Sequence, residues 1–171
     1  MASQYLYIMS NLPKRTHPRL KNFDYSKNGL YFLTICVKNK KELLCDIVGR
    51  DVPDAPNIFL SKTGKIVEKY IHTINNANSI TVEKYVIMPD HIHLLIFIDN
   101  TDGVSGTSRP THSRLSRTVS GFKRLCNKEL GRNIWQTSFY DHIIRNEEDY
   151  KIHYRYIEDN PVMWVLNKHE I

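Results

Sequence analysis

Two histidines, His91 and His93, stand one residue apart near the start of the stretch "MPDHIHLLIFID" (88–99), which is otherwise mostly apolar. Side chains two residues apart on a strand point to the same face, and neutral imidazoles are common ligands of divalent metals. Burying an imidazole without a partner costs free energy, so the pair needs an explanation. The spacing fits one metal ion held by both rings, and it also fits two solvated or hydrogen-bonded histidines.

A tyrosine and a carboxamide form a second candidate group in "NEEDYKIHYRYIEDNP" (146–161). Tyr156 and Asn160 are four residues apart, so they share one face of a helix predicted there. A phenol can serve as a nucleophile, and a carboxamide oxygen can bind a metal ion. Tyr150 and Tyr154 lie on the ordinary packing stripe of the same helix. Tyr156 can equally be another half-buried aromatic residue.

Asn160 has an alternative role because it precedes Pro161. The residue before a proline is disfavoured in helical geometry, so Asn160 can instead cap a following turn over residues 161–166. As a cap, its side chain would be occupied by backbone amides. The residues alone leave the metal-ligand and cap interpretations open.

The remaining pattern predicts the elements that must bring these side chains together. A turn at Pro89-Asp90 joins two strands in a hairpin, and the polar stretch with Gly49, Pro53 and Pro56 is expected to be a loop. Strands are predicted over 29–39, 79–89, 91–99 and 134–145, and helices over 61–76, about 113–130 and 146–161. The order predicts an α+β, ferredoxin-like antiparallel sheet with helices on one face, plus a C-terminal helix that carries Tyr156.

Composition indicates one globular domain. The 171 residues are 41% hydrophobic and 25% charged, and we expect a single domain over 1–171 that begins with an irregular basic arm over 1–24. No apolar run is long enough to span a membrane, and no secretory signal is apparent, so we expect a cytoplasmic protein without a membrane partner. The three cysteines lack metal-binding or disulfide spacing.

Basic residues outnumber acidic ones, 24 to 18, and they gather in two places. This balance favours a nucleic-acid partner, although a charged helix face is often merely solvated. Gly121 lies in a gap of the basic stripe on the helix over 113–130. The candidate DNA-binding residues are Arg114, Arg117, Lys123, Arg124 and Lys128 on that helix, and Lys14, Arg15 and Arg19 in the arm.

The stretch "MPDHIHLLI" resembles the histidine-hydrophobic-histidine (HUH) motif of single-tyrosine transposases. The block "IWQTSFYDHIIRNEEDYKIHYRYIEDNP" (134–161) resembles their REP-associated branch, which is close to the insertion-sequence enzymes. The likeness extends over about residues 20–165 and includes "NGLYFLTICVKNKKELL" and "SRLSRTVSGFKRL". The triplet alone is not specific, whereas the three blocks together are.

The resemblance implies an enzyme that nicks and rejoins single-stranded DNA at hairpin-forming repeats through a 5′-phosphotyrosine. It implies Tyr156 as the nucleophile and His91 and His93 as ligands of Mg²⁺ or Mn²⁺. Asn160 falls where insertion-sequence relatives place a third ligand, often glutamine. The resemblance also implies action at the nucleoid, as a monomer or as a homodimer that exchanges its tyrosine helices.

Two other functions remain open at this stage. The first is a catalytically inactive protein of the same fold that binds hairpin DNA. The second is another HUH enzyme, such as a replication initiator or a relaxase, which the small single domain and the distal tyrosine block argue against.

Overall fold

An antiparallel sheet of four strands, in the order β4–β5–β1–β6, forms the centre of the protein in a computed structural model that describes residues 28–49, 56–75, 79–99 and 114–168. The strands are β1 (Gly29–Cys36), β4 (Ile80–Ile87), β5 (His91–Ile98) and β6 (Tyr140–Ile144). The two inner strands, β1 and β5, pair along their whole lengths. β5 is apolar on both faces after its histidines because both faces are covered.

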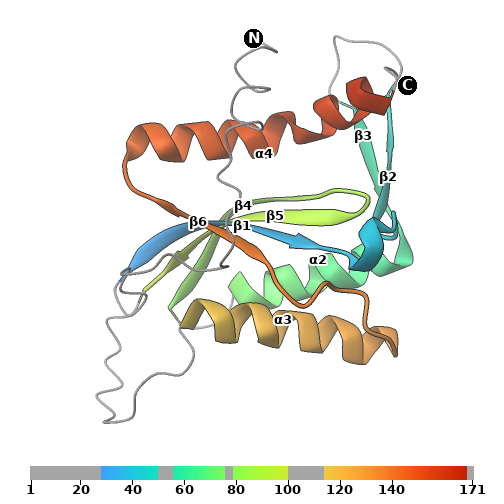
Figure 1. Cartoon of the computed structure of the whole chain (residues 1–171), viewed down its shortest axis with the longest axis horizontal. Helices are drawn as coiled ribbons and strands as arrows, with labels where there is room; N and C mark the ends of the chain where they lie inside the picture. The colour runs from blue at the N-terminus through green and yellow to red at the C-terminus, as the bar shows by residue number, and fades with distance from the viewer. Residues whose placement is uncertain (1–27, 50–55, 76–78, 100–113, 169–171) are drawn as a thin grey trace.

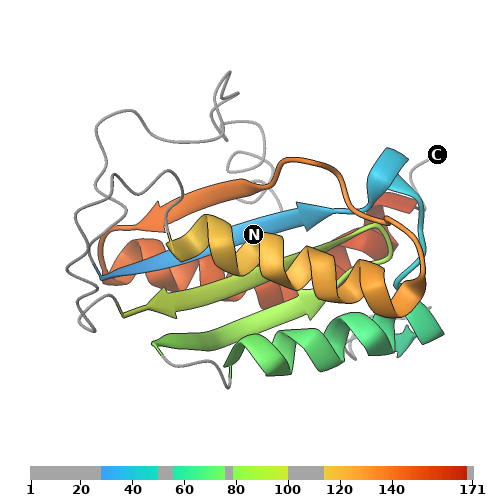
Figure 2. The same cartoon turned by 90° about the horizontal axis from the view of Figure 1, so that it is seen from below.

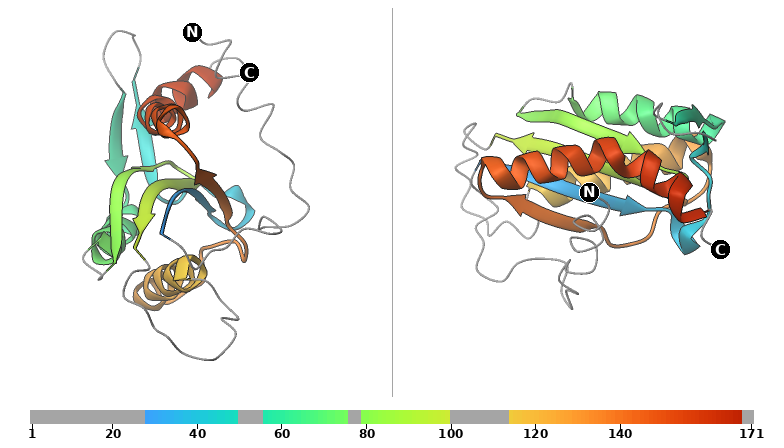
Figure 3. Two further views of the ribbon diagram at one scale, coloured as in Figure 1. Left: turned by 90° about the vertical axis from the view of Figure 1, so that its left-hand side faces the viewer. Right: turned by 90° about the horizontal axis from the view of Figure 1, so that it is seen from above.

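Helices cover both faces of the sheet. α2 (Lys62–Asn75) and α3 (Arg114–Leu130) lie side by side on one face, as Figures 1 and 2 show. α4 (Glu147–Lys168) lies across the opposite face of the four-stranded sheet (Figure 3). This is the predicted α+β, ferredoxin-like arrangement with an added C-terminal helix, and the prediction is confirmed.

The alternation of side chains along the strands produces two apolar clusters. Leu33 on β1 and Leu94 on β5 belong to the larger cluster, which α2 and α3 cover. Phe32 and Leu95 point the other way and pack with Ile157 of α4 in a smaller cluster. His93 and His91 stand two and four residues before Leu95, so the three side chains point to the same face of β5. The histidines therefore lie on the face beneath α4.

The helices on the larger cluster begin and pack as their sequences predict. The Ser61 hydroxyl accepts a hydrogen bond from the Gly64 amide at 3.0 Å and caps α2. A Cβ at Gly64 would lie 2.0 Å from the carbonyl oxygen of Leu44, so only glycine fits there. The apolar residues that α3 buries against this cluster are Leu115, Val119, Phe122 and Cys126.

Two predictions need correction: the end of the first strand, and the stretch that was expected to be a loop. β1 ends at Cys36 rather than at residue 39, and a short helical turn, η1 (Lys38–Lys40), follows it. The stretch expected to be a loop contains a separate hairpin of β2 (Cys45–Val48) and β3 (Asn57–Leu60). Each of these strands has only four residues and is largely exposed, so the apolar alternation that marks a longer strand is weak.

The strand predicted over 134–145 is also shorter in the structure. β6 covers only Tyr140–Ile144, and Trp135 makes an isolated bridge to Val37. Between these two points, the Lys123 ammonium donates hydrogen bonds to the carbonyl oxygens of residues 136, 137 and 138 at 2.7, 3.2 and 2.9 Å. Those carbonyls are satisfied by a side chain, so they need no partner strand.

The last helix begins as predicted and ends later. The Asn146 side chain accepts a hydrogen bond from the Asp149 amide at 2.8 Å and caps α4. The helix then continues through Pro161 to Lys168, so the interpretation of Asn160 as a cap is wrong. Among the described residues, no helix combines the length and the apolar character needed to cross a membrane.

Candidate active site between the sheet and the last helix

The two histidine rings converge on one point at the start of β5. Their Nε2 atoms are 3.0 Å apart, and the ring planes are 75° apart. Two nitrogens bound at right angles to one metal ion, each at about 2.1 Å, would also be about 3 Å apart. His93 is 3% exposed, whereas His91 is partly exposed at the entrance. The pair thus combines a buried ligand with one that solvent can reach.

Each ring has a partner at its other nitrogen. Asp90 accepts a hydrogen bond from Nδ1 of His91, and Nδ1 of His93 lies 2.9 Å from the Thr34 hydroxyl. Burial raises the pKa of Asp90, but its hydrogen bond to His91 and the nearby Lys40 ammonium outweigh burial and hold the pKa below its usual value. Asp90 is therefore ionised and requires a proton on Nδ1 of His91.

The hydrogen-bond partners of the two histidine rings show whether the rings are oriented to bind a metal ion. With its proton on Nδ1, His91 directs the Nε2 lone pair toward His93. Burial holds the pKa of His93 well below its usual range, so this ring is neutral. A carboxylate that orients a ligating imidazole is a common arrangement around protein-bound metals. The donor set and its orientation therefore fit a divalent cation.

Tyr156 lies against these histidines on the same face of the sheet. Its ring centroid is 5.1 Å from that of His93 and 5.7 Å from that of Phe32, with edge-to-face geometry in both pairs. Tyr154 points elsewhere, because its hydroxyl accepts a hydrogen bond at 3.2 Å from Lys84 on the outer strand β4. The structure thus distinguishes Tyr156 from its neighbour on the same helix.

The surroundings of the Tyr156 phenol have opposing effects on its ionisation. Burial raises the pKa of Tyr156, and this is the largest effect; a hydrogen bond with the Asn160 side chain and the positive charge of Lys40 partly offset it. Asn160 is 9% exposed and lies one turn further along α4. Trp164 follows after another turn, with its ring 6.1 Å from His91. Asn160 and Trp164 therefore line the site beyond Tyr156.

A second group of metal-ligand types lies beside this site. His142 of β6 places Nε2 3.0 Å from both carboxylate oxygens of Asp149, and Nδ1 of His153 lies 3.1 Å from one of them. Their three ligand atoms lie within 4.8 Å of one another. The two rings, however, are stacked at 4.4 Å and only 19° from parallel. A ligated metal lies in the plane of each imidazole, and planes this nearly parallel do not meet near both nitrogens.

The same group is better explained as a polar clamp between β6 and α4. Nδ1 of His153 also lies 2.8 Å from the backbone carbonyl of Asp149, and the Arg145 amide donates to the Asp149 carboxylate at 3.0 Å. His153 in turn contacts Phe32 at 4.8 Å between ring centroids. The clamp therefore fixes the first turn of α4 and, through Phe32, the neighbourhood of Tyr156.

The clamp predicts a pH effect on stability. Burial is the main reason that the pKa of His153 is lowered below 6.5. The unfolded chain then takes up a proton on His153 that the folded chain does not, so this contribution to stability is present above pH 6.5 and lost below it. His153→Phe should reduce the acid-side loss by up to about 1.4 kcal/mol per pH unit. Urea unfolding at pH 7.5 and 5.5 measures this difference.

The exposed His72 provides the control for that measurement. His72→Phe should leave the acid-side slope as it is in the unaltered chain. An equal slope in His153→Phe and the unaltered chain would show that His153 does not resist protonation in the folded state.

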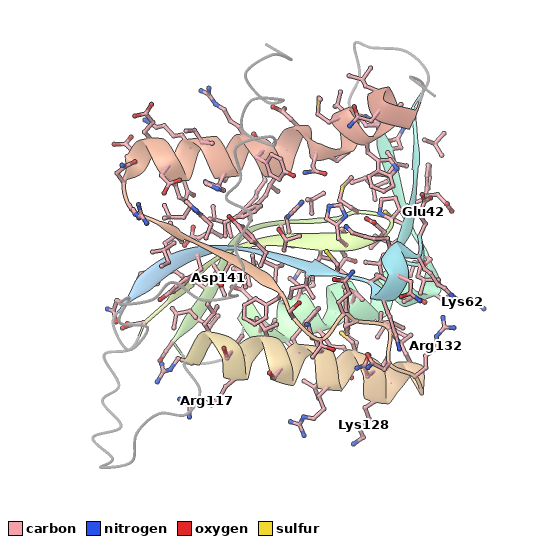
Figure 4. The ribbon with its side chains drawn as sticks, in the orientation of Figure 1. Glu42, Lys62, Arg117, Lys128, Arg132 and Asp141 are labelled. Carbon is pink, nitrogen blue, oxygen red and sulfur yellow. The ribbon has the colours of Figure 1, made fainter. Side chains whose placement is uncertain are left out.

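The predicted DNA-binding residues lie away from the histidines. α3 is on the opposite face of the sheet, and Figure 4 shows Arg117 and Lys128 pointing from it to the outside. Arg114 donates a hydrogen bond to the Asp99 carbonyl oxygen, and burial lowers the pKa of Lys123 to about 8. The candidates from the N-terminal arm, Lys14, Arg15 and Arg19, fall outside the described residues.

Sequence reasoning missed several residues that the structure places at the site. Asp90 stands next to His91 in the chain and was interpreted only as part of a turn. Thr34 is identified only by strand register, since it pairs directly with His93. Lys40 and Trp164 come from distant segments, and no local pattern marks them.

Comparisons with known proteins identify the family of this chain. The family described as IS200-like transposases matches residues 25–160. An uncharacterized protein of Haemophilus influenzae is 31% identical over 163 residues, covering 85% of this chain and 87% of its own. The REP-associated tyrosine transposase of Escherichia coli K12 is 26% identical over 143 residues, with 82% and 72% covered.

A solved structure shares the fold. The REP-associated tyrosine transposase bound to a REP hairpin aligns with a TM-score of 0.59 and 22% identity, over 85% of this chain and 73% of that one. The family match spans the whole sheet and reaches Asn160, so it includes both histidines and Tyr156. This chain belongs to the IS200-like transposase family.

Proposed function

We propose that this transposase nicks and rejoins single-stranded DNA through a covalent 5′-phosphotyrosine at Tyr156, with His91 and His93 holding Mg²⁺ or Mn²⁺. The observation that carries the proposal is the placement of the Tyr156 ring 5.1 Å from His93, whose Nε2 is 3.0 Å from that of His91. A nucleophile and two converging metal ligands are the groups that this reaction needs.

The reaction replaces one phosphate ester by another. The Tyr156 phenol loses its proton, and its oxygen bonds to the phosphorus of a DNA phosphodiester. The bond from phosphorus to the 3′ oxygen of the preceding nucleotide breaks, and that oxygen takes up a proton. Because the product is again a phosphodiester, attack by another 3′-hydroxyl rejoins DNA and releases the tyrosine without ATP.

The residues of the site act on different parts of this reaction. A phenol titrates near pH 10, and burial raises the pKa of Tyr156 further. The hydrogen bond from Asn160 and the charge of Lys40 act in the opposite direction and favour the phenolate. A bound divalent cation would supply positive charge at the phosphate. Asp90 and Thr34 orient the imidazoles that would hold the cation, and Asn160 remains a candidate third ligand.

Hairpin DNA is the substrate class that we propose, because the solved relative is bound to a REP hairpin. Arg117, Arg124 and Lys128 are exposed on the side of the sheet away from the histidines. They would bind DNA at a distance from the nick, so a hairpin that contacts both surfaces must pass around an edge of the sheet. We propose a monomer acting at the nucleoid, with His91, His93 and Tyr156 of one chain forming the site.

The test is a search for the covalent product. Labelled hairpins from the genomic neighbourhood of the gene are incubated with the protein in Mg²⁺ or EDTA and separated by denaturing electrophoresis. A protein–DNA band that needs Mg²⁺, with the nucleotide found on Tyr156 by peptide mass, is the expected result. Tight hairpin binding without any band would instead support the inactive DNA-binding protein, and a nucleotide on another tyrosine would move the nucleophile.

A further inference from the structure

Lys40 lies beside the candidate active site although it comes from the turn after β1. Its ammonium is 3.4 Å from the Asp90 carboxylate, on the oxygen that His91 leaves available. Just over half of the Lys40 side chain is exposed, whereas that of Asp90 is buried. An ammonium that is held at its inner side and open on its outer side can accept an anionic ligand from solvent.

The turn that carries Lys40 is attached to the histidine loop. The Val37 amide donates to the Asp90 carbonyl at 2.8 Å, and the Leu43 and Leu44 amides donate to the Pro89 carbonyl at 2.9 and 3.0 Å. The segment on each side of Lys40 is therefore fixed to the residues that immediately precede His91. This leaves little freedom for the position of Lys40 relative to the histidines.

The backbone at Lys40 is held in a conformation that lysine disfavours. Asn39 and Lys40 have φ of 58° and 53°, and these are two of the three non-glycine residues with positive φ among those described. Asparagine tolerates this region, whereas lysine meets a steric penalty there. Such conformations persist where the surrounding structure imposes them, and they concentrate at functional sites.

A series of contacts connects Lys40 with both components of the site. Asp90 holds the Lys40 ammonium on one carboxylate oxygen and His91 on the other, and His91 faces His93, which is in ring contact with Tyr156. A phosphate that Tyr156 attacks must occupy the space near the phenol and the two Nε2 atoms. Because the Lys40 side chain is long and just over half exposed, its ammonium can extend from Asp90 to contact an oxygen of that phosphate.

We infer that Lys40 is a further catalytic residue, which binds the phosphate under attack and offsets the negative charge that develops on it. This inference rests on the proposed function, since it assigns a partner to the phosphate in that reaction. It adds a positive charge supplied by the chain itself, besides that of the metal ion that the histidines would hold. Preorganised charges of this kind stabilise the transition state more than the ground state.

The first experiment measures adduct formation under single-turnover conditions with saturating hairpin DNA. Lys40→Met should lower the rate about 10- to 100-fold, as expected for losing one charged contact at a reacting phosphate. Lys41→Met is the matched control, because Lys41 is the adjacent exposed lysine, and its rate should stay unchanged. If Lys40→Met is as fast as the unaltered chain, the inference is wrong.

A second variant separates this role from folding. Lys40→Gly removes the same charge as Lys40→Met but relieves the strain of positive φ, so it should be more stable than Lys40→Met and equally slow. Asp90→Asn tests whether Lys40 acts only through Asp90. In a chain that already carries Asp90→Asn, Lys40→Met should slow adduct formation further. If the rate did not fall further, Lys40 would act only by positioning Asp90, and the inference would be wrong.

A binding measurement keeps the inference testable even without an adduct. Inorganic phosphate is titrated in Mg²⁺ and followed by ³¹P NMR for the unaltered chain, Lys40→Met and Lys41→Met. Phosphate affinity should fall about 5-fold or more in Lys40→Met alone. That result would support Lys40 even if no adduct formed and the proposed function failed. Equal affinity in all three chains would overturn the inference.

Discussion

Tyr156→Phe is expected to lower the rate of covalent adduct formation at least about 10⁴-fold, because it removes the oxygen that bonds to phosphorus. The phenylalanine ring keeps the edge-to-face contacts with His93 and Phe32. DNA binding and the melting temperature should therefore change little. Denaturing electrophoresis measures the adduct, and fluorescence anisotropy with the same hairpin measures binding.

Tyr154→Phe is the matched control for that substitution. Tyr154 lies two residues earlier on α4, and its hydroxyl is hydrogen-bonded to Lys84. We expect the Tyr154→Phe chain to form the adduct at nearly the normal rate. An undiminished adduct in Tyr156→Phe, or a lost one in Tyr154→Phe, would show that the nucleophile has been assigned to the wrong residue.

His93→Ala is expected to weaken Mn²⁺ binding more than about 100-fold and to abolish the metal-dependent adduct, because it removes the buried one of the two proposed ligands. The substitution also leaves a cavity beside Phe32 and Tyr156, which should cost about 1–3 kcal/mol of stability. His91→Ala removes the more exposed ligand and should lose Mn²⁺ with a smaller effect on folding. Calorimetric titration of the chain alone with Mn²⁺ measures this affinity without DNA.

Two other histidines serve as controls for the metal site. His72→Ala changes an exposed ring on α2, and His142→Ala opens the clamp on Asp149. Neither should change Mn²⁺ affinity by more than about 3-fold, because the stacked ring of His142 is not aligned with that of His153 for a common ligand. Loss of Mn²⁺ binding in His142→Ala with retention in His93→Ala would move the metal to the clamp.

The long elements of the fold were predictable because their apolar periodicity is strong. β5 and α3 each have enough residues for their periodicity to be recognised, and both lie within the ranges predicted for them. The β2–β3 hairpin was missed because four-residue strands carry little periodicity. The extra turns of α4 were missed because Pro161 is usually a boundary, whereas here the buried face of the helix continues past it to Trp164.

Three residues of the candidate site were identified from the sequence, two by their spacing and one by the family resemblance. His91 and His93 share a face by strand geometry, and the family resemblance singled out Tyr156. Their supporting partners depend on tertiary contacts: Thr34 is 59 residues from His93 along the chain. Lys40 depends on a backbone conformation that a lysine disfavours, and no rule of propensity would place it there.

The packing of α4 on the sheet of its own chain has a consequence for kinetics. In the monomer proposed above, the histidines and Tyr156 meet within one chain and need no second copy. Nicking per molecule should then be first order and insensitive to dilution, in contrast to an enzyme whose tyrosine comes from a neighbouring copy. A cell holding only a few molecules of this transposase would retain the full turnover of each one.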